Sequence, residues 1–369
     1  MSQAVRVGVV GCGAISGAYF VGARVFPWLQ FVACADLDRT AALRKATEFG
    51  VPRVLSVDGL LADPEVDVVL NLTVPKAHAA VALAALQAGK HTYSEKPLGV
   101  GRDEGRQVLE QAARRGLRVG CAPDTVLGAG IQTARELISH GAIGRPVAFT
   151  AFYMSRGHES WHPSPEFFYQ PGGGPMFDMG PYYLTALFHL LGPPRRLAGA
   201  ATITQPHRHI TSDPKFGKFL RVETPDHVCG TLEFESGAAG VVIQSFATHH
   251  AQYDAAHPIT IYGTDGALKV PDPNTFDGQV FLRRAPDAEW REVPHTFVRG
   301  YGRSVGLADM AQALGSGRPH RCSGELAYAV LDAMQGFLDS AASGRAHDPA
   351  ARFARPAPMP SHLPFGVLD

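Results

Sequence analysis

VRVGVVGCGAIS, residues Val5–Ser16, is the stretch of sequence that decides the fold. Val5–Val10 is a short apolar run rich in β-branched residues, which favours a strand. The run stops at Gly11, where a residue without Cβ permits a tight turn, and Gly13 lets a phosphate approach the backbone where a helix begins. Strand, glycine-rich turn and helix start therefore follow one another in the order typical of a dinucleotide-binding unit.

A second apolar run ends in an acidic residue. Phe31–Ala35 is strand-like, and Asp36 follows it about 20 residues beyond the glycine turn, where a carboxylate can accept hydrogen bonds from ribose hydroxyls. Asp36 favours NAD because a carboxylate repels the 2′-phosphate of NADP, whereas the nearby Arg39 keeps NADP open as an alternative. A glycine-rich turn alone also occurs for purely structural reasons. Here, however, the strand, the turn, the helix start, the second strand and the acid all follow one another in the expected order. The candidate cofactor-binding residues of this part are Gly11, Gly13, Ala14, Ile15 and Asp36.

Composition limits the classes of function. The 369 residues are enough for two domains, and 34 basic residues balance 34 acidic ones, so the polycationic surface that nucleic acid or an anionic membrane requires is not expected. No apolar run approaches about 20 residues, and the N-terminus runs straight into the first strand without a signal-peptide region. The five cysteines are scattered without a CxxC motif, which favours reduced thiols in a cytoplasmic protein.

The order of strand-like and helical runs changes near residue 124. Before it, strand-like and helical runs alternate, which predicts an α/β fold with a doubly wound parallel sheet. Loops after strands ending near Val10, Asn71 and Glu95 should then converge on one crevice. Beyond it, strands follow one another, which predicts an α+β domain with an open, mainly antiparallel sheet. We therefore expect a dinucleotide-binding domain at residues 1–124 and a substrate-binding and oligomerisation domain at residues 125–369.

The segment Gly172–Gly192 has the spacing of a single helix. Pro175 suits the first helical position, and Gly192 with the two prolines after it ends the helix. Apolar residues at helical spacing predict the packed stripe: Met176, Met179, Tyr183, Leu187 and Leu190. Polar residues at steps of four, three and four predict a stripe facing away from the core: Asp178, Tyr182, Thr185 and His189. An acid and a phenol should thus lie one turn apart, with a kink near Pro181.

Lys96 is a second candidate for chemistry. It follows a strand end at the cofactor edge of the predicted sheet, and Pro97 restricts its backbone to an extended conformation. An ammonium group there can hydrogen-bond a substrate hydroxyl and bias its proton toward leaving, and its charge would lower the pKa of a neighbouring acid. Taken alone, a Glu-Lys-Pro triplet is more typical of a solvated lysine in a loop.

Three separated motifs resemble the glucose-fructose oxidoreductase / inositol dehydrogenase / MocA (Gfo/Idh/MocA) family: the glycine turn at residues 11–16, Glu95-Lys96-Pro97, and GGGPMFDMG at Gly172–Gly180. The resemblance extends from residue 5 to about residue 345. It implies a Rossmann domain, an open antiparallel sheet domain, NAD or NADP, and hydride transfer on sugars, inositols or related polyols. It makes Lys96 catalytic and adds cofactor-binding candidates: Thr73, Pro75, His78, Glu95 and Lys96 itself. For His78, a plain strand-end turn is an equal alternative.

The chain departs from the family's commonest pattern, Asp-x-Gly-x-His, because Tyr182 stands where the histidine would be. It is more similar to the family's tyrosine branch, which includes glucose-fructose oxidoreductase and dimeric dihydrodiol dehydrogenase. A tyrosine with an unperturbed pKa of about 10 needs an adjacent cation to act as a base, and Lys96 is the candidate. The resemblance thus implies that Lys96 and Tyr182 handle the proton while Asp178 orients the substrate or the lysine. A merely buried Tyr182 is the alternative.

Trp161 and His162 precede the glycine run, where relatives often have a Trp-Arg pair lining the cofactor or substrate. We expect both to bind substrate together with Lys96, Asp178 and Tyr182. Because His162 stands where those relatives have arginine, the resemblance supports this role less strongly for His162 than for Trp161. Residues 158–166 hold potential metal ligands, but in a proline-broken loop with no recognised spacing. Substrate hydrogen bonding is therefore favoured, and no metal site is expected.

The sequence thus predicts an NAD(P)-dependent oxidoreductase that transfers hydride between the nicotinamide and a CH–OH/C=O centre of a sugar, inositol or related polyol. Two alternatives stay open: a redox-silent protein that binds dinucleotide or sugar, and an NAD-dependent glycosidase. An open sheet with one uncovered face predicts a homodimer or homotetramer. The other expected partner is a small sugar or polyol, with no nucleic acid and no membrane.

Overall fold

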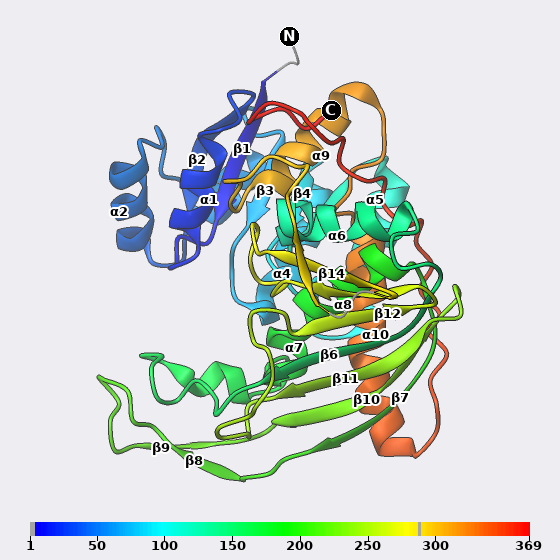
Figure 1. The fold of residues 1–369 in the computed structure, drawn as a ribbon. Coiled ribbons are helices and arrows are strands. Elements are labelled where there is room, and N and C mark those ends of the chain that lie inside the picture. The colour runs from blue at the N-terminus through cyan, green and yellow to red at the C-terminus, as the bar shows by residue number, and fades with distance from the viewer. Residues whose placement is uncertain (1–3, 287–288) are drawn as a thin grey trace. The chain divides into compact units, whose positions relative to one another are not determined.

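The computed structural model describes residues 4–286 and 289–369, and the contacts within the chain divide it into two compact units (Figure 1). Unit 1 comprises Met1–Ala129, Thr296–Tyr328 and Pro356–Asp369, and unit 2 comprises Gly130–His295 and Ala329–Arg355. Two C-terminal segments thus belong to unit 1, although the linear prediction places them with residues 125–369. Hydrogen bonds hold one of them there, because the backbone N–H of Cys121 donates to the carbonyl of Cys322. That each unit is a separate functional domain stays a prediction.

Unit 1 is built on a five-stranded parallel sheet in the order β2-β1-β3-β4-β5, as the alternating pattern predicts. Its strands are β1 (Val5–Val10), β2 (Leu29–Ala35), β3 (Val68–Asn71), β4 (His91–Ser94) and β5 (Val119–Cys121). The strand order reverses between β1 and β3, and in such sheets ligands bind in the crevice beyond the strand ends at that point. The helices of the unit are α1 (Ser16–Ala23), α2 (Arg39–Phe49), α3 (Val57–Ala62), α4 (Pro75–Gln87), α5 (Arg102–Arg115) and α9 (Val305–Ser316), with the single turn η1 (Thr125–Leu127).

Local sequence explains where these helices begin and end. Asp38 accepts a hydrogen bond from the backbone N–H of Thr40 at the start of α2, and a left-handed Gly50 ends that helix. Pro75 lies in the first turn of α4, where its missing backbone N–H leaves no helical hydrogen bond unmade. Gly116 ends α5 in the same way as Gly50 ends α2.

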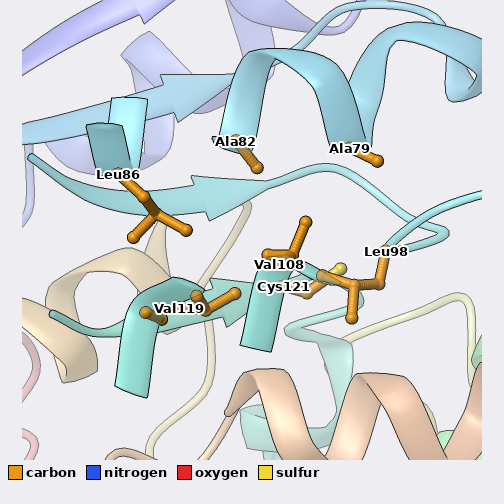
Figure 2. Close-up of a cluster of buried hydrophobic side chains, with 8 residues drawn as sticks. Ala79, Ala82, Leu86, Leu98, Val108, Val119 and Cys121 are labelled. Atoms are coloured by element: carbon orange, nitrogen blue, oxygen red, sulfur yellow. The ribbon is translucent and has the colours of Figure 1, made fainter. Parts of the chain in front are cut away.

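A cluster of buried apolar side chains fixes the connection between β4 and α5 (Figure 2). It joins α4, α5, β5 and the loop after β4: Ala79, Ala82, Leu86, Leu98, Val108, Ala112, Val119 and Cys121. Leu98 is 1% exposed and lies two residues beyond Lys96. Burial of such a side chain stabilises by roughly 1.5–3 kcal/mol, so the backbone that carries Lys96 is held by the core on its C-terminal side.

Unit 2 contains an eight-stranded sheet in the order β15-β14-β13-β12-β6-β11-β10-β7. Its strands are β6 (Pro146–Met154), β7 (Pro194–Thr202), β10 (His227–Phe234), β11 (Ala239–Ser245), β12 (Ile259–Gly263), β13 (Gly266–Val270), β14 (Val280–Arg284) and β15 (Arg291–Val293). The pairing is antiparallel except between β6 and β11, which confirms the predicted mainly antiparallel sheet. A separate pair, β8 (His207–His209) and β9 (Phe219–Arg221), was not predicted.

One face of this sheet carries the core of unit 2. Phe234 of β10 lies edge-to-face against Phe188, with ring centroids 6.1 Å apart. Phe337 of α10 (Gly324–Ser343, shown in orange in Figure 1) packs so closely on β7 and β10 that only glycine fits at Gly199 and Gly230. The remaining helices are α6 (Ala129–Ser139), η2 (Pro165–Tyr169), α7 (Gly174–Asp178) and α8 (Gly180–Leu191). No helix among residues 4–286 and 289–369 is long and apolar enough to cross a membrane.

The single helix predicted to begin at Pro175 and to end before Gly192 is in fact two helices, because the chain breaks at Met179, close to the kink expected near Pro181, into α7 and α8. Pro181 lacks a backbone N–H and therefore lies in the first turn of α8 rather than inside a continuous helix. The polar stripe does not face away from the core either, since all of α8 is buried. His189, for example, is fully buried and its Nε2 lies 2.8 Å from Nη1 of Arg135.

Candidate functional site

The glycine turn after β1 has the geometry that a bound phosphate group requires. Gly11 has a φ of +98°, and a Cβ there would lie 2.6 Å from the carbonyl carbon of Leu72, so only glycine fits. A Cβ at Gly13 would meet no atom within 4 Å, which leaves its backbone open. Gly13, Ala14 and Ile15 are exposed directly before α1. The residues predicted to hold the dinucleotide phosphates therefore form an accessible helix start that fits the group.

Asp36 lies directly after β2 and is partly exposed. One carboxylate oxygen accepts a hydrogen bond of 2.7 Å from the backbone N–H of Cys12, and the other accepts one of 2.9 Å from Asp38. A carboxylate has about four acceptor positions, so both oxygens can still accept from ribose hydroxyls. The bond to Cys12 ties Asp36 to the glycine turn, and no sequence signal indicates it. Arg39, the residue that leaves NADP as an alternative cofactor, is exposed at the start of α2.

The loop after β3 contains Thr73, Pro75 and His78. The ring of His78 is 1% exposed, with Nδ1 2.7 Å from the carbonyl oxygen of Pro97 and Nε2 2.9 Å from that of Thr73. Burial lowers the pKa of His78, although these two carbonyls oppose the shift. Asn71 holds the same loop, because its Oδ1 accepts a hydrogen bond of 2.7 Å from the Thr73 hydroxyl. Both ring nitrogens of His78 thus contact backbone oxygens, which favours the structural interpretation over direct cofactor contact.

Glu95 and Lys96 follow β4 in unit 1. The carboxylate of Glu95 is buried, and it accepts hydrogen bonds of 2.8 Å from the hydroxyl of Tyr19 and 3.0 Å from the backbone N–H of Lys96. Burial raises the pKa of Tyr19, which keeps its phenol protonated as the donor. Lys96 itself is partly exposed, and the peptide bond between it and Pro97 is cis. Glu95 therefore links α1 to the backbone of Lys96, a contact that sequence reasoning missed.

Asp178 and Tyr182 lie in unit 2 on either side of the break at Met179. Asp178 is the last residue of α7 with its side chain 17% exposed, and Tyr182 is in the first turn of α8 and 6% exposed. The Oδ2 atom of Asp178 is 3.2 Å from Nε2 of His158, a buried residue that the sequence analysis did not select. The only sequence signal for His158 was its place among the polar residues of the 158–166 loop.

Trp161 and His162 extend this same part of unit 2. Trp161 is 62% exposed, and the two rings lie 5.3 Å apart. The Nδ1 atom of His162 accepts a hydrogen bond of 3.0 Å from the backbone N–H of Ser164, and burial lowers the pKa of this histidine. A neutral His162 then carries its proton on Nε2, where it can donate to a ligand.

A buried ion-pair network anchors the loop that carries these residues. Arg208 lies 2.9 Å from both Glu159 and Asp226, and the side chains of Arg208 and Asp226 are 4% and 0% exposed. Burial alone would lower the pKa of Arg208, but Asp226 and Glu159 raise it above the usual value. Glu159 also accepts a hydrogen bond from the hydroxyl of Tyr169. Across the described residues, no group of three or more His, Cys, Asp and Glu side chains is arranged to hold a metal ion.

A parallel sheet with an open glycine turn after β1, an acid after β2 and a helix start between them defines a dinucleotide-binding domain of the Rossmann class. Two family models match the chain. Residues 5–122 match "Oxidoreductase family, NAD-binding Rossmann fold", and residues 131–269 match "GFO/IDH/MocA C-terminal domain". The chain belongs to the GFO/IDH/MocA oxidoreductase family, which confirms the family and fold predicted from its motifs.

Individual relatives are enzymes named for carbohydrates. A 1,5-anhydro-D-fructose reductase of Ensifer adhaerens is 28% identical over 268 residues, which cover 71% of this chain and 74% of that protein. A D-xylose 1-dehydrogenase (NADP(+)) of Haloferax volcanii is 26% identical over 344 residues, covering 92% and 98% of the two chains. The solved structure of levoglucosan dehydrogenase in complex with NADH and L-sorbose shares the fold, with a TM-score of 0.82 and 22% identity over 95% of this chain and 100% of that one.

Proposed function

We propose that this protein is an NAD-dependent dehydrogenase or reductase of a sugar, inositol or related polyol. The observation that carries this proposal is the placement of Lys96, whose backbone is fixed by Glu95 on one side and by buried Leu98 on the other, in the unit that binds the dinucleotide. A lysine whose backbone is held on both sides suits a group that must meet a reacting hydroxyl. The carbohydrate names of the reductase and dehydrogenase relatives support the substrate class.

The residues of unit 1 bind and orient in this proposal. Gly11 and Gly13 present backbone to the pyrophosphate, and Asp36 accepts from the adenosine ribose. The bound nicotinamide supplies a hydride acceptor or donor. Lys96 donates a hydrogen bond to the substrate oxygen at the reacting carbon and biases its proton.

The residues of unit 2 recognise the substrate in this proposal. Asp178, partly exposed at the end of α7, accepts a hydrogen bond from a substrate hydroxyl and so positions it. Tyr182 takes part in the proton transfer, as the resemblance to the tyrosine branch of the family implies. The exposed indole of Trp161 offers an apolar face to a sugar ring, and His162 offers a donor at Nε2.

A substrate panel tests the proposal. The purified protein is incubated with NAD and a set of sugars, inositols and other polyols, and absorbance at 340 nm reports the reduced nicotinamide. A substrate-dependent rise supports the dehydrogenase. No rise with any substrate, together with tight NADH or sugar binding, would favour the redox-silent alternative. Release of an aglycone from a glycoside without net NADH would favour the glycosidase.

The preference between the two dinucleotides can be tested at Asp36. We expect Asp36→Ser to weaken NADH binding by about tenfold, the equivalent of about 1.4 kcal/mol, because the ribose loses a charged acceptor. NADPH binding should improve in the same variant, because the repulsion of the 2′-phosphate is removed. Nicotinamide fluorescence titration measures both dissociation constants. Asp38→Ser, which removes the acid that begins α2, is the control and should leave the ratio unchanged. An unchanged ratio in Asp36→Ser contradicts the assignment.

We also propose that the outward face of the large sheet binds a second copy of the chain. Its residues are small or apolar and partly exposed: Ala148, Thr150, Phe152, Cys229, Thr231, Val241, Ile243, Thr260 and Tyr262. Val241 and Tyr262 are 39% and 43% exposed, and none of the residues in this set is charged. Ile243→Lys is expected to shift the protein to monomers in sedimentation velocity. Leu43→Lys, on exposed α2, is the control. A wild-type monomer at micromolar concentration would contradict the proposal.

A cytoplasmic location is proposed on the state of the cysteines. All five are thiols in the structure, and Cys12, Cys34, Cys121 and Cys322 are buried. Reduced, buried cysteines are typical of reducing compartments. Cell fractionation with an antibody to the native chain tests this proposal.

A further inference from the structure

His158 occupies an unusual environment for a histidine. Its ring is packed among aromatic side chains, with centroid distances of 5.1 Å to Trp161, 4.0 Å to Phe168 and 4.4 Å to Phe246. The residue is 6% exposed. Its Nε2 faces the carboxylate of Asp178 at 3.2 Å, while its Nδ1 is buried without a hydrogen-bond partner. Among the residues that the structure describes, the ring therefore has one polar side-chain contact, and that contact is the candidate site residue Asp178.

This arrangement indicates which nitrogen of the ring is the donor. An ionised carboxylate only accepts hydrogen bonds, so the Nε2 atom that faces Asp178 carries a proton. A proton on Nδ1 would place a buried N–H against aromatic rings with no acceptor, which is unfavourable. The ring therefore donates a hydrogen bond from Nε2 to Oδ2 of Asp178.

The position of His158 is set from outside the site. Its backbone N–H donates a hydrogen bond of 3.1 Å to the hydroxyl of Tyr169, which in turn donates to Glu159. Glu159 is held by Arg208, and Arg208 by the fully buried Asp226. Loops are in general more mobile than helices and strands. The ion-pair network next to His158 restrains this part of the loop and so fixes the position of the His158 backbone.

We propose that His158 is a positioning residue for Asp178, holding through its Nε2–H the carboxylate orientation that binds the substrate hydroxyl. This inference rests on the proposed function, because it gives Asp178 its role toward the substrate. Asp178 ends a helix of only five residues before the break at Met179, so its side chain needs support from another element. His158 provides this support at Oδ2, and because a carboxylate has about four acceptor positions, Asp178 can accept from a substrate hydroxyl as well.

Two variants of His158 separate positioning from packing. The amide nitrogen of glutamine can replace Nε2 as a donor, whereas phenylalanine preserves the packing of the ring and removes the donor. We expect His158→Phe to lower kcat with the best substrate of the panel at least tenfold, with an NADH dissociation constant unchanged within twofold. We expect His158→Gln to retain kcat within about threefold of wild type. His207→Gln, at an exposed position of β8, is the matched control and should be unchanged.

Equal loss of kcat in His158→Gln and His158→Phe would overturn the proposal, as would full activity of His158→Phe. A second measurement does not depend on turnover. In a long-range ¹H–¹⁵N spectrum of histidine-labelled protein, the signals lost in His158→Gln should show the Nε2–H form and should shift in Asp178→Asn. An Nδ1–H form, or signals insensitive to Asp178→Asn, would overturn the pairing. Because this spectrum needs no substrate, a failed substrate panel refutes the proposed function without deciding the His158–Asp178 pair.

Discussion

Replacing Lys96 by alanine is expected to lower kcat by at least about 10²-fold, the usual contribution of a positioned group that transfers a proton. NADH affinity should stay near the wild-type value, because the glycine turn and Asp36 do not depend on the ammonium group. The backbone at this position should also keep its place, since Glu95 accepts from the Lys96 N–H and Leu98 remains buried. The loss should therefore appear in kcat rather than in cofactor binding.

Stopped-flow absorbance at 340 nm and fluorescence titration with NADH measure these two quantities separately. Lys218→Ala, which removes an exposed lysine of unit 2, is the control for loss of one positive charge. Unchanged turnover in Lys96→Ala would exclude a role of this residue in proton transfer. A parallel loss of NADH affinity would instead make Lys96 a cofactor-binding residue.

Replacing Arg208 by methionine is expected to lower the unfolding free energy by about 3–5 kcal/mol, the cost of leaving buried charges without their partner. Asp226 is fully buried, and among the described contacts the other hydrogen bonds to its carboxylate come from Thr204 alone. Methionine keeps most of the volume of the arginine stem, so the loss reflects charge rather than a cavity. Urea-induced unfolding followed by circular dichroism measures the change.

The double variant Arg208→Met, Asp226→Asn should recover part of this loss, because it removes one of the two unpaired carboxylates. Arg221→Met, whose side chain is 77% exposed and 3.9 Å from Glu223, is the control and should change stability by no more than about 0.5 kcal/mol. An equal, small effect of Arg208→Met and Arg221→Met would mean that the buried network contributes no more than a surface ion pair.

The parts of the fold that the sequence predicts correctly are those with local signals. The strand, turn and helix start of Val5–Ser16 are adjacent in the chain, and the acid after the second strand lies at a fixed spacing from them. At Pro181 the sequence predicts a kink but not the full break at Met179, because the helical periodicity of the segment continues across it. The parallel pairing of β6 with β11 could not be predicted either. The relative direction of two strands depends on the connection between them, and the composition of the strands does not determine it.

The supporting contacts of the candidate site could not be predicted from the sequence for a related reason. Tyr19 with Glu95, and Arg208 with Glu159, join residues that are far apart along the chain and follow no repeating pattern. His158 and Asp178 are closer in sequence, but irregular loop and two short helices separate them, so no period relates their side chains. The roles proposed for Lys96, Asp178 and Tyr182 remain predictions.

The hydrogen bond between Tyr19 and Glu95 has a geometrical consequence for a long ligand. A dinucleotide has a pyrophosphate in its middle and a reactive ring at one end, at a separation that its covalent structure limits. In unit 1 the helix start assigned to the pyrophosphate belongs to α1, and the lysine assigned to the reactive end follows Glu95 directly. The phenol–carboxylate contact therefore ties the segment that carries Lys96 to the helix whose start is assigned to the pyrophosphate. A displacement of α1 would thus also displace the backbone at Lys96.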